Sequence, residues 1–365
     1  MRNRFVSRAT RLRVAVTALM LLVTSPALAQ VAPTTAQGFF NIFQAKNDWT
    51  WSGGDQVTSL KARNGLIYWS FGDTLLGAEN ATTGAYVSGW QMIANTILVQ
   101  RGGQLGATTW GAAVPNASDG DRYWTQGMFE ANGFLYVLCQ RVRNTPEGWF
   151  ELRGVELAKF ELRTDGTLGF LGMRSTPSTG RIGGNSAAAT QYAGDAVVSG
   201  TYVYVFGYAN APSDPYAPHR SYVARVAVGQ VETPSAWRFR YSDGTWGTDM
   251  ALAAPILSAQ VSSVRLIGGS WYLAYKPWNG WGDTVYIERR SSPWGQALGT
   301  TTVSSPAGTT AGGRKYQTYS PQLHPEQSLT SGRVLLSIAW NGETLSDVAA
   351  DADLYKPRFY EVTLP

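Results

Sequence analysis

The chain has 365 residues, of which 44% are hydrophobic and 15% are charged, so it can bury a large core and a disordered chain is excluded. Its 40 glycines, 14 tryptophans and 18 tyrosines favour strands and turns over helices. The net charge of +5 equals the charge of the five arginines in residues 1–30, so the rest of the chain is neutral and has no electrostatic footprint for nucleic acid or for an anionic membrane surface.

Residues 1–29 have the pattern of a signal peptide. Five arginines form a basic start, an apolar run follows at Val14–Val23, and Ala27-Leu28-Ala29 matches a cleavage site. This run is too short to span a bilayer permanently, and no later stretch approaches the roughly 18 apolar residues that a membrane span needs. We therefore expect cleavage after Ala29 and an exported mature chain, residues 30–365, that is secreted or periplasmic and has no membrane span.

Five turns that end in glycine precede strand-like runs rich in aromatic and β-branched residues. The glycines are Gly65, Gly133, Gly200, Gly269 and Gly332, and they lie 68, 67, 69 and 63 residues apart. A strand-like run also precedes each glycine, so each unit contains a hairpin and leaves room for two more strands, such as Met92–Val99 and Ser221–Val226. Radial repetition of four antiparallel strands makes a β-propeller. We expect an all-β fold, a single five-bladed β-propeller over residues 30–365 with few helices; a β-sandwich with chance spacing is the alternative.

The single cysteine and the two histidines limit the chemistry. Cys139 ends an apolar strand-like run, which is typical of a buried, inert thiol, and it has no second cysteine to pair with. The histidines are His324 and His219, the latter in a proline-rich segment expected to overhang the propeller mouth, and with one cysteine they do not make a zinc site. No phosphate-binding or dinucleotide-binding motif occurs. We expect no cofactor and no metal, although calcium held by Asp and carbonyl oxygens stays open.

The first hairpin places two acidic residues opposite each other. Centred on Asn64, regular antiparallel pairing brings Asp55, nine residues before, against Asp73, nine residues after. Like charges at that separation are unfavourable unless one carboxyl keeps its proton, so the pKa of one of them should be raised. The pair should lie at the open end of the hairpin, where a propeller binds its ligands.

Two carboxyl groups at a concave mouth with aromatic neighbours are the equipment for glycoside hydrolysis. One carboxyl can donate a proton while the other attacks the sugar or activates water. The alternative is that Asp55 and Asp73 are turn residues that accept hydrogen bonds from backbone amides.

Regular antiparallel pairing about the turn of each other unit predicts the remaining residues at the propeller mouth. It sets Tyr123 and Trp124 against Arg141, Gln260 against Lys276, and Gln322 and His324 against Trp340 and Asn341. Aromatic faces stack on sugars, while amides and cations bind hydroxyls, although each tryptophan could instead pack between blades, His324 could be structural and Asn95 could cap a strand. The candidate substrate-binding residues are Asn95, Tyr123, Trp124, Gln126, Arg141, Lys276, Trp278, Gln322 and His324.

Four segments carry a family resemblance: 53–55 (Gly-Gly-Asp), 69–74 (Trp-Ser-Phe-Gly-Asp-Thr), 92–96 (Met-Ile-Ala-Asn-Thr) and 319–326 (Tyr-Ser-Pro-Gln-Leu-His-Pro-Glu). They resemble an exported bacterial domain family, formerly of unknown function, that includes endo-D-arabinanase glycoside hydrolases and is similar in architecture to five-bladed furanosidases. The resemblance implies that Asp55 and Asp73 are the catalytic carboxylates. The chain departs from the family at Gln126, where relatives carry an acidic residue, and at Asp195, where a small residue is expected.

The leading hypothesis is an exported glycoside hydrolase that cleaves furanosyl linkages, in an arabinan and potentially D-arabinan. Asp121 and Asp195 are the main candidates for a further catalytic residue, the proton donor, and Glu326 is a third. A polysaccharide is thus the expected substrate or ligand. A non-catalytic glycan-binding propeller is the alternative, and an envelope protein that docks a partner is a further one.

Overall fold

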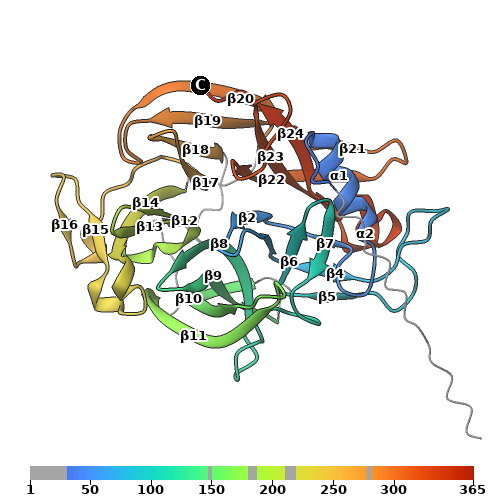
Figure 1. Cartoon of the computed structure of the whole chain (residues 1–365), viewed down its shortest axis with the longest axis horizontal. Coiled ribbons are helices and arrows are strands. Elements are labelled where there is room, and N and C mark those ends of the chain that lie inside the picture. Colours follow the sequence, from blue (N-terminus) through green and yellow to red (C-terminus); the bar gives the residue numbers. More distant parts are fainter. Residues whose placement is uncertain (1–30, 147–149, 180–186, 210–218, 278–281) are drawn as a thin grey trace, which may run out of the picture.

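The computed structural model describes residues 31–146, 150–179, 187–209, 219–277 and 282–365, and within them the strands form six antiparallel sheets (Figure 1). The predicted signal peptide at 1–29 and the candidate Trp278 lie outside these residues. In the part of the chain that is described, no helix has the length and hydropathy needed to cross a membrane. The all-β prediction is confirmed.

Five of the sheets contain four or five strands each. The first has β2 (Thr58–Lys61), β3 (Ile67–Phe71), β6 (Thr96–Arg101) and β7 (Gln104–Ala107). The second has β8 (Arg122–Ala131), β9 (Phe134–Asn144), β10 (Phe150–Leu162) and β11 (Leu168–Thr179). The third has β12 (Gln191–Ser199), β13 (Tyr202–Ala209), β14 (Arg220–Ala227), β15 (Arg238–Arg240) and β16 (Trp246–Gly247). The fourth has β17 (Gln260–Ile267), β18 (Ser270–Lys276), β19 (Thr284–Arg290) and β20 (Ala297–Ser304), and the fifth has β21 (Gly308–Thr309), β22 (Lys315–His324), β23 (Val334–Gly342) and β24 (Arg358–Val362).

The sixth sheet is small and joins β1 (Gly53–Gly54), β4 (Thr74–Leu76) and β5 (Gln91–Ile93). β1 and β4 continue the β2–β3 hairpin in the same register, because Gly54 pairs with Thr74 just as Thr58 pairs with Ser70. The short helices are α1 (Ala36–Ala45), α2 (Leu345–Ala350), η1 (Ala187–Ala189), η2 (Val228–Gln230), η3 (Pro234–Ala236), η4 (Met250–Leu252) and η5 (Ala352–Tyr355).

The sheets are arranged as in a propeller. β2, β8, β12, β17 and β22 contact one another in this order, and β22 also contacts β2, so the inner strands close a ring (Figure 1). This propeller-like arrangement agrees with the prediction. The expected count of five blades is not confirmed, because the strands form six sheets.

The predicted glycine turns are confirmed. Gly65, Gly133, Gly200, Gly269 and Gly332 have φ angles of 80°, 82°, 60°, 81° and 68°, a region that favours glycine. Each of them joins two paired antiparallel strands, from β2–β3 to β22–β23.

Each inner strand is interrupted near one end of its hairpin. The pairing register shifts between Thr125 and Met128 in β8, Gln191 and Asp195 in β12, Val261 and Ser263 in β17, and Tyr319 and Gln322 in β22. In the first hairpin, Gln56 lies between β1 and β2 with a φ of 52°. Such bulges bend a strand and re-aim its side chains.

The shift in β22 overturns the predicted pairing of the last hairpin. Gln322 pairs with Ser337 and His324 with Leu335, whereas Trp340 and Asn341 face Thr318 and Gln317. The assumption of regular pairing about the turn failed here because a nine-residue connection between β22 and β23 displaces the register. It succeeded in the second and fourth sheets, where Tyr123 pairs with Arg141 and Gln260 with Lys276.

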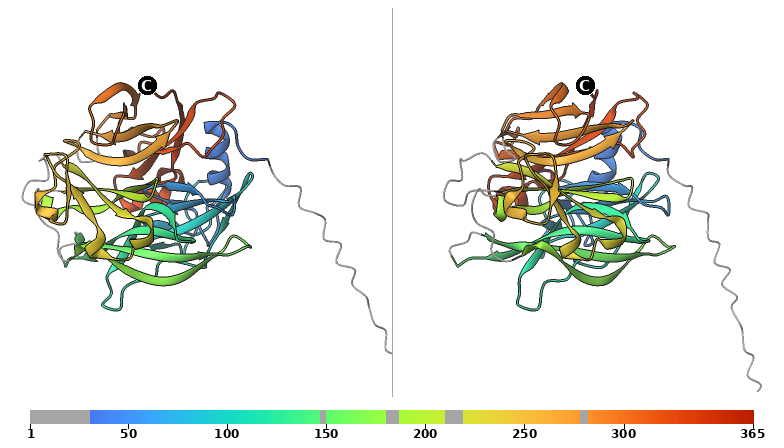
Figure 2. Two further views of the ribbon diagram at one scale, coloured as in Figure 1. Left: turned by 60° about the vertical axis from the view of Figure 1, so that its left-hand side comes forward. Right: turned by 90° about the vertical axis from the view of Figure 1, so that its left-hand side faces the viewer.

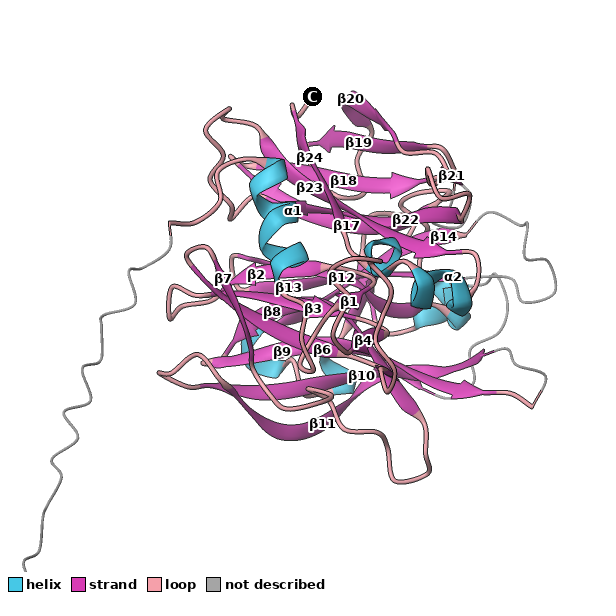
Figure 3. Cartoon of the chain, turned by 90° about the vertical axis from the view of Figure 1, so that its right-hand side faces the viewer, coloured by secondary structure: helices cyan, strands magenta, loops and turns pink. Residues whose placement is uncertain are grey.

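Helix α1 was not predicted. The Thr35 side chain caps it by accepting from the Gly38 amide, and Phe39 and Phe43 are wholly buried on its inner face. The ring of Phe43 lies 5.0 Å from that of Trp69 and 5.2 Å from that of Phe359. α1 thereby joins the first sheet to the last strand, β24 (Figure 2), and lies on the same flank as α2 (Figure 1, Figure 3).

Candidate functional site

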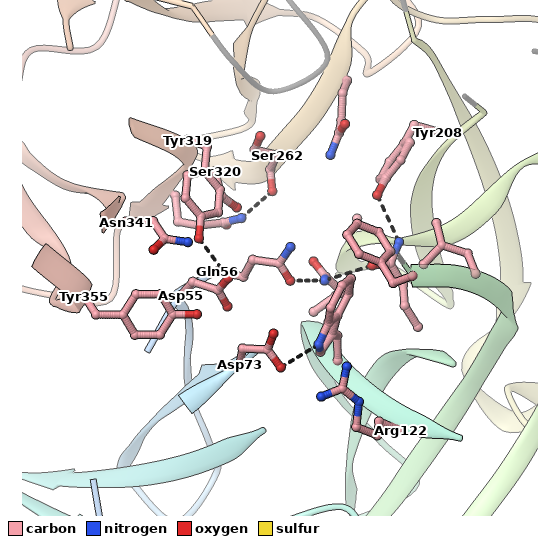
Figure 4. A pocket seen from close by; sticks show the side chains of 18 of the residues that line it. Asp55, Gln56, Asp73, Arg122, Tyr208, Ser262, Tyr319, Ser320, Asn341 and Tyr355 are labelled. Atoms are coloured by element: carbon pink, nitrogen blue, oxygen red, sulfur yellow. Dashed lines mark hydrogen bonds between the residues drawn. The ribbon is translucent and has the colours of Figure 1, made fainter. Parts of the chain in front are cut away.

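A cavity of about 570 Å³ opens where the inner strands are bulged. Its lining includes residues from the interruptions in every inner strand: Gln56, Gln126, Gly194, Val261, Ser262 and Ser320. Asp55 and Asp73 also line it, and both carboxyl groups face the same space (Figure 4). The predicted convergence of the two acidic residues on one cavity is therefore present.

The backbone of the first hairpin sets Asp55 against Asp73. The Asp55 amide donates to the Asp73 carbonyl (3.2 Å), and the Gly72 amide donates to the Asp55 carbonyl (2.9 Å). A Cβ atom at Gly72 would lie 2.5 Å from Asp55 Oδ1, closer than real Cβ contacts. The absence of a side chain at position 72 thus makes room for the Asp55 carboxyl group.

The two oxygens of the Asp55 carboxyl group have different surroundings. Oδ2 accepts from the Tyr319 hydroxyl (2.8 Å), and the Tyr355 side chain is a second hydrogen-bond partner of the carboxyl. Oδ1 is buried and has no partner among the described residues. Burial and then the charge of Asp73 raise the pKa of Asp55 to about 8, against the weaker effect of the two tyrosines.

Asp73 lies in a more polar environment. Its Oδ1 accepts from the Trp124 indole (2.8 Å), and the Arg122 guanidinium is nearby. Burial raises the pKa of Asp73 as well, while Trp124 and Arg122 act in the opposite direction. These differences make Asp73 the carboxyl group of the pair that ionises first and Asp55 the one that keeps its proton.

Uncharged amides form much of the remaining wall. Gln126 Nε2 donates to Gln56 Oε1 and to Gln140 Oε1 (3.2 Å), and Gln140 Nε2 donates to Gln191 Oε1 and to the Tyr208 hydroxyl (both 3.0 Å). These side chains come from the first three sheets, so their contacts connect the sheets around the cavity.

His219 extends this wall toward the fourth sheet. The Tyr208 ring stacks on the His219 ring at 5.3 Å, and His219 Nδ1 lies 2.7 Å from Gln260 Oε1. Burial lowers the pKa of His219, which favours the neutral imidazole. The rest of the predicted overhanging segment, 210–218, lies outside the described residues.

Residues 37–363 match the family described as a domain of unknown function, DUF5005. The chain belongs to the DUF5005 family. Its sequence has no match among curated proteins.

The DUF5005 chain is similar to several solved structures. A protein from Bacteroides ovatus ATCC 8483, described as a "putative hydrolase", is 19% identical with a TM-score of 0.70, over 89% of this chain and 88% of that chain. The GH43_1 enzyme from Xanthomonas citri is 13% identical with a TM-score of 0.49, over 89% and 93% of the two chains. RS223 β-xylosidase is 11% identical with a TM-score of 0.46, over 87% and 95%. The likeness to the Bacteroides protein establishes a shared fold.

Two predicted acidic residues of the DUF5005 chain are placed away from the cavity lining. Asp195 is buried and bound by the Arg265 guanidinium and by the amides of Val264 (2.7 Å) and Ala196 (2.8 Å). Asp121 is buried as well, and Arg141 Nε (2.7 Å) and Arg143 Nε (2.5 Å) bind its two oxygens. Both carboxylates are thus already occupied by arginines, as expected for structural ion pairs.

Four predicted binding residues have structural partners instead of cavity contacts. Asn95 bonds the backbone of Val114 and Tyr123 through three hydrogen bonds. The Tyr123 hydroxyl and Arg141 both bind Glu156. The Lys276 ammonium is buried and donates to the carbonyls of Gly282, Ser305 and Thr318 and to the Thr318 hydroxyl, and burial lowers its pKa to about 8.

His324 and Glu326 belong to a buried cluster. His324 Nε2 lies 2.7 Å from the Ser337 hydroxyl, and the Ser59 hydroxyl contacts both His324 Nδ1 and Glu326. Burial lowers the pKa of His324 and raises that of Glu326. Neither residue is part of the cavity lining.

Of the predicted site residues, the structure brings together Asp55, Asp73, Trp124, Gln126 and Gln322. The cavity is also lined by four side chains that were not among the predicted site residues: Tyr319, Tyr355, Arg122 and Glu343. Glu343 is the third carboxylate of the described lining, and it pairs with Lys315 at 3.4 Å. Within the described ranges, no group of three or more His, Cys, Asp or Glu residues could hold a metal ion.

Proposed function

We propose that this DUF5005 protein is a glycoside hydrolase in which Asp55 and Asp73 are the catalytic residues. The observation that carries the proposal is the pair of opposed carboxyl groups at one cavity, with the pKa of Asp55 raised to about 8. One protonated and one ionised carboxyl group, facing the same space, is the state in which a glycosidase starts its reaction.

In this proposal Asp55 transfers its proton to the oxygen of the leaving sugar as the bond from that oxygen to the anomeric carbon breaks. The Asp73 carboxylate stabilises the positive charge that develops on the anomeric carbon. It either removes a proton from the water that attacks this carbon, or attacks the carbon itself to form a glycosyl-enzyme that water then hydrolyses. Trp124 holds Asp73 through its indole N–H (2.8 Å), and Tyr319 holds Asp55 through its hydroxyl (2.8 Å). The anomer of the first product, read by NMR, distinguishes the two roles of Asp73.

The finer parts of the proposal come from the sequence. The substrate is a furanosyl polysaccharide of the arabinan type, with D-arabinan as the first choice, in line with the family resemblance to endo-D-arabinanases. The protein is exported after cleavage at Ala29, and residues 30–365 form one five-bladed propeller in which the β1–β4–β5 sheet extends the first blade. The shared register of β1–β4 and β2–β3 supports this grouping.

The test is the release of reducing ends from D-arabinan, L-arabinan and fructan by the purified mature protein. Asp55→Asn and Asp73→Asn should each lower the rate by about 100- to 10,000-fold. Asp243→Asn is the matched control, because Asp243 is an exposed turn aspartate that binds Thr245. Full activity in either cavity variant would refute the assignment, and binding of a glycan without any cleavage would favour the glycan-binding alternative.

A further inference from the structure

The Gln126 amide belongs to a chain of hydrogen bonds in the cavity wall. Gln140 Nε2 donates to Gln191 Oε1 and to the Tyr208 hydroxyl, and Gln140 Oε1 accepts from Gln126. In this arrangement Gln126 presents its NH2 group to Gln140.

The two N–H groups of Gln126 are both used inside the protein. One donates to Gln140 Oε1 at 3.2 Å and the other to Gln56 Oε1. Gln126 Oε1 has no hydrogen-bond partner among the described residues, and the side chain is partly exposed to the cavity that it lines. Gln126 thus offers a ligand an acceptor and no donor.

Gln322 on β22 also has an amide oxygen without a partner among the described residues. Its Nε2 donates to the Ser262 carbonyl (2.5 Å), which fixes the amide, and its Oε1 is buried without a partner among the described residues. Gln322 is 3% exposed and lines the same cavity. An unsatisfied buried acceptor is unfavourable, and a donor on a bound ligand would satisfy it.

The ligand that complements such a wall carries hydroxyl groups and no negative charge. A carboxylate or phosphate has only acceptors and would face the oxygens of Gln126 and Gln322. The one arginine of the described lining, Arg122, donates to the Asn144 side chain (2.5 Å) and adjoins Asp73, so an acidic ligand would compete with the Asp73 carboxylate for its charge.

We propose that Gln126 Oε1 and Gln322 Oε1 accept hydrogen bonds from ring hydroxyls of a bound sugar, and that the cavity therefore selects neutral glycans with free hydroxyl groups. This inference rests on the proposed function for its choice of sugar ligand. It assigns the acceptor atoms that determine specificity, and it makes methylated or acidic glycans poor ligands.

The experiment is a calorimetric binding titration in the Asp73→Asn background, in which turnover should be slow enough for binding to be measured. The probes are an arabino-oligosaccharide and its fully O-methylated form. Gln126→Met removes the acceptor at similar size, and Gln104→Met is the matched control on β7, because Gln104 is exposed outside the cavity. Gln322→Met is a second variant, and the two probes test the unaltered cavity even if a variant fails to fold.

The free oligosaccharide should bind the parent protein about tenfold more tightly than the methylated form. Gln126→Met should weaken the free oligosaccharide by about tenfold and leave the methylated probe unchanged, and Gln104→Met should change neither. Equal binding of the two probes, no binding of either probe, or an unchanged affinity in Gln126→Met would overturn the inference. If this pattern holds but the wild-type protein cleaves no polysaccharide, the proposed function fails and the binding site stands.

Discussion

Asp55 keeps a buried oxygen without a partner while its other oxygen is held by Tyr319. An ionised carboxylate would leave that buried oxygen uncompensated next to the negative charge of Asp73, so the protonated form is favoured. The Asp55 carboxyl group thus supplies the proton for the proposed reaction, and its burial destabilises the folded protein at a pH where it ionises.

The pH dependence of hydrolysis should report the proton on Asp55. Because the pKa of Asp55 is raised to about 8, the proton is present at neutral pH and is lost as the pH rises through that value. We expect the rate of reducing-end release to fall on the alkaline side of about pH 8. The residual rate of Asp55→Asn should lack this decline, and a wild-type rate that stays constant to pH 9.5 would contradict the role of Asp55 as the acid.

Asp55→Asn should also change how stability depends on pH. The pKa of Asp55 in the folded protein lies above the ordinary value of an aspartate, about 3.9, so the stabilising contribution is complete below that value and is lost as the pH rises toward about 8. The melting temperature of Asp55→Asn minus that of the wild type should therefore increase between pH 4 and pH 8.5. Scanning calorimetry measures this difference in melting temperature. Asp243→Asn is the control, because hydrogen bonds from Thr245 lower the pKa of Asp243, so its melting-temperature difference should not increase over the same pH range.

At the residue level, the sequence was informative where the partner was close in the chain. Asp55 and Asp73 were identified because both lie nine residues from one turn. Tyr319 and Tyr355 were not, because they reach Asp55 from the other end of the chain. The ion pairs of Asp121 and Asp195 were not predicted, because the arginines that bind them sit on other strands or far along the chain.

The first hairpin is the element on which the site depends, and Gly72 tests its geometry. A methyl group at this position would come within 2.5 Å of Asp55 Oδ1 and 3.2 Å of Gln56 Oε1, so the carboxyl group must move. We expect Gly72→Ala to lower the hydrolysis rate at least about tenfold and to cost about 1–3 kcal/mol in the free energy of unfolding.

Gly229→Ala is the control for this variant. A Cβ at Gly229 meets no atom within 4 Å, and its φ is not in the left-handed region. Initial rates and urea unfolding of the two variants provide the comparison. If Gly72→Ala were as active as Gly229→Ala, the close packing of Asp55 would not matter for the reaction.

Hairpin register was predictable where the turn was tight and not where a longer connection joined the strands. The glycine turns gave the pairing of Gln260 with Lys276 and of Tyr123 with Arg141, although a bulge lies between the turn and each pair. In the last hairpin, nine residues connect β22 to β23, and the register of Gln322 differs from the prediction. The bulges matter more than the turns for function, because the bulged residues line the cavity.

Contacts between the two ends of the described chain close the ring of sheets. α1 packs on β24, and the Ala36 amide donates to Glu361 (3.1 Å). The repeat spacing revealed the ring but not this helix, because α1 presents only two wholly buried side chains, Phe39 and Phe43. The β1–β4–β5 sheet was unforeseen for a similar reason, since its strands are two or three residues long.

Phe43→Ala should weaken the packing of α1 against the first sheet and β24. Phe43 is wholly buried among Trp51, Trp69 and Phe359, so its removal should cost about 3–5 kcal/mol in the free energy of unfolding. Leu252→Ala, at a side chain that is 62% exposed, should have little effect. Urea denaturation followed by tryptophan fluorescence measures both, and an unchanged midpoint for Phe43→Ala would show that α1 does not hold the ring closed.

The enclosure of Cys139 has a practical consequence. It is the only thiol in the chain, and its side chain is fully buried in β9. A cysteine introduced at the rim of the cavity would therefore be the one site that a maleimide dye can reach in the native protein. Such a label would give an optical signal for sugar entry without any competing background.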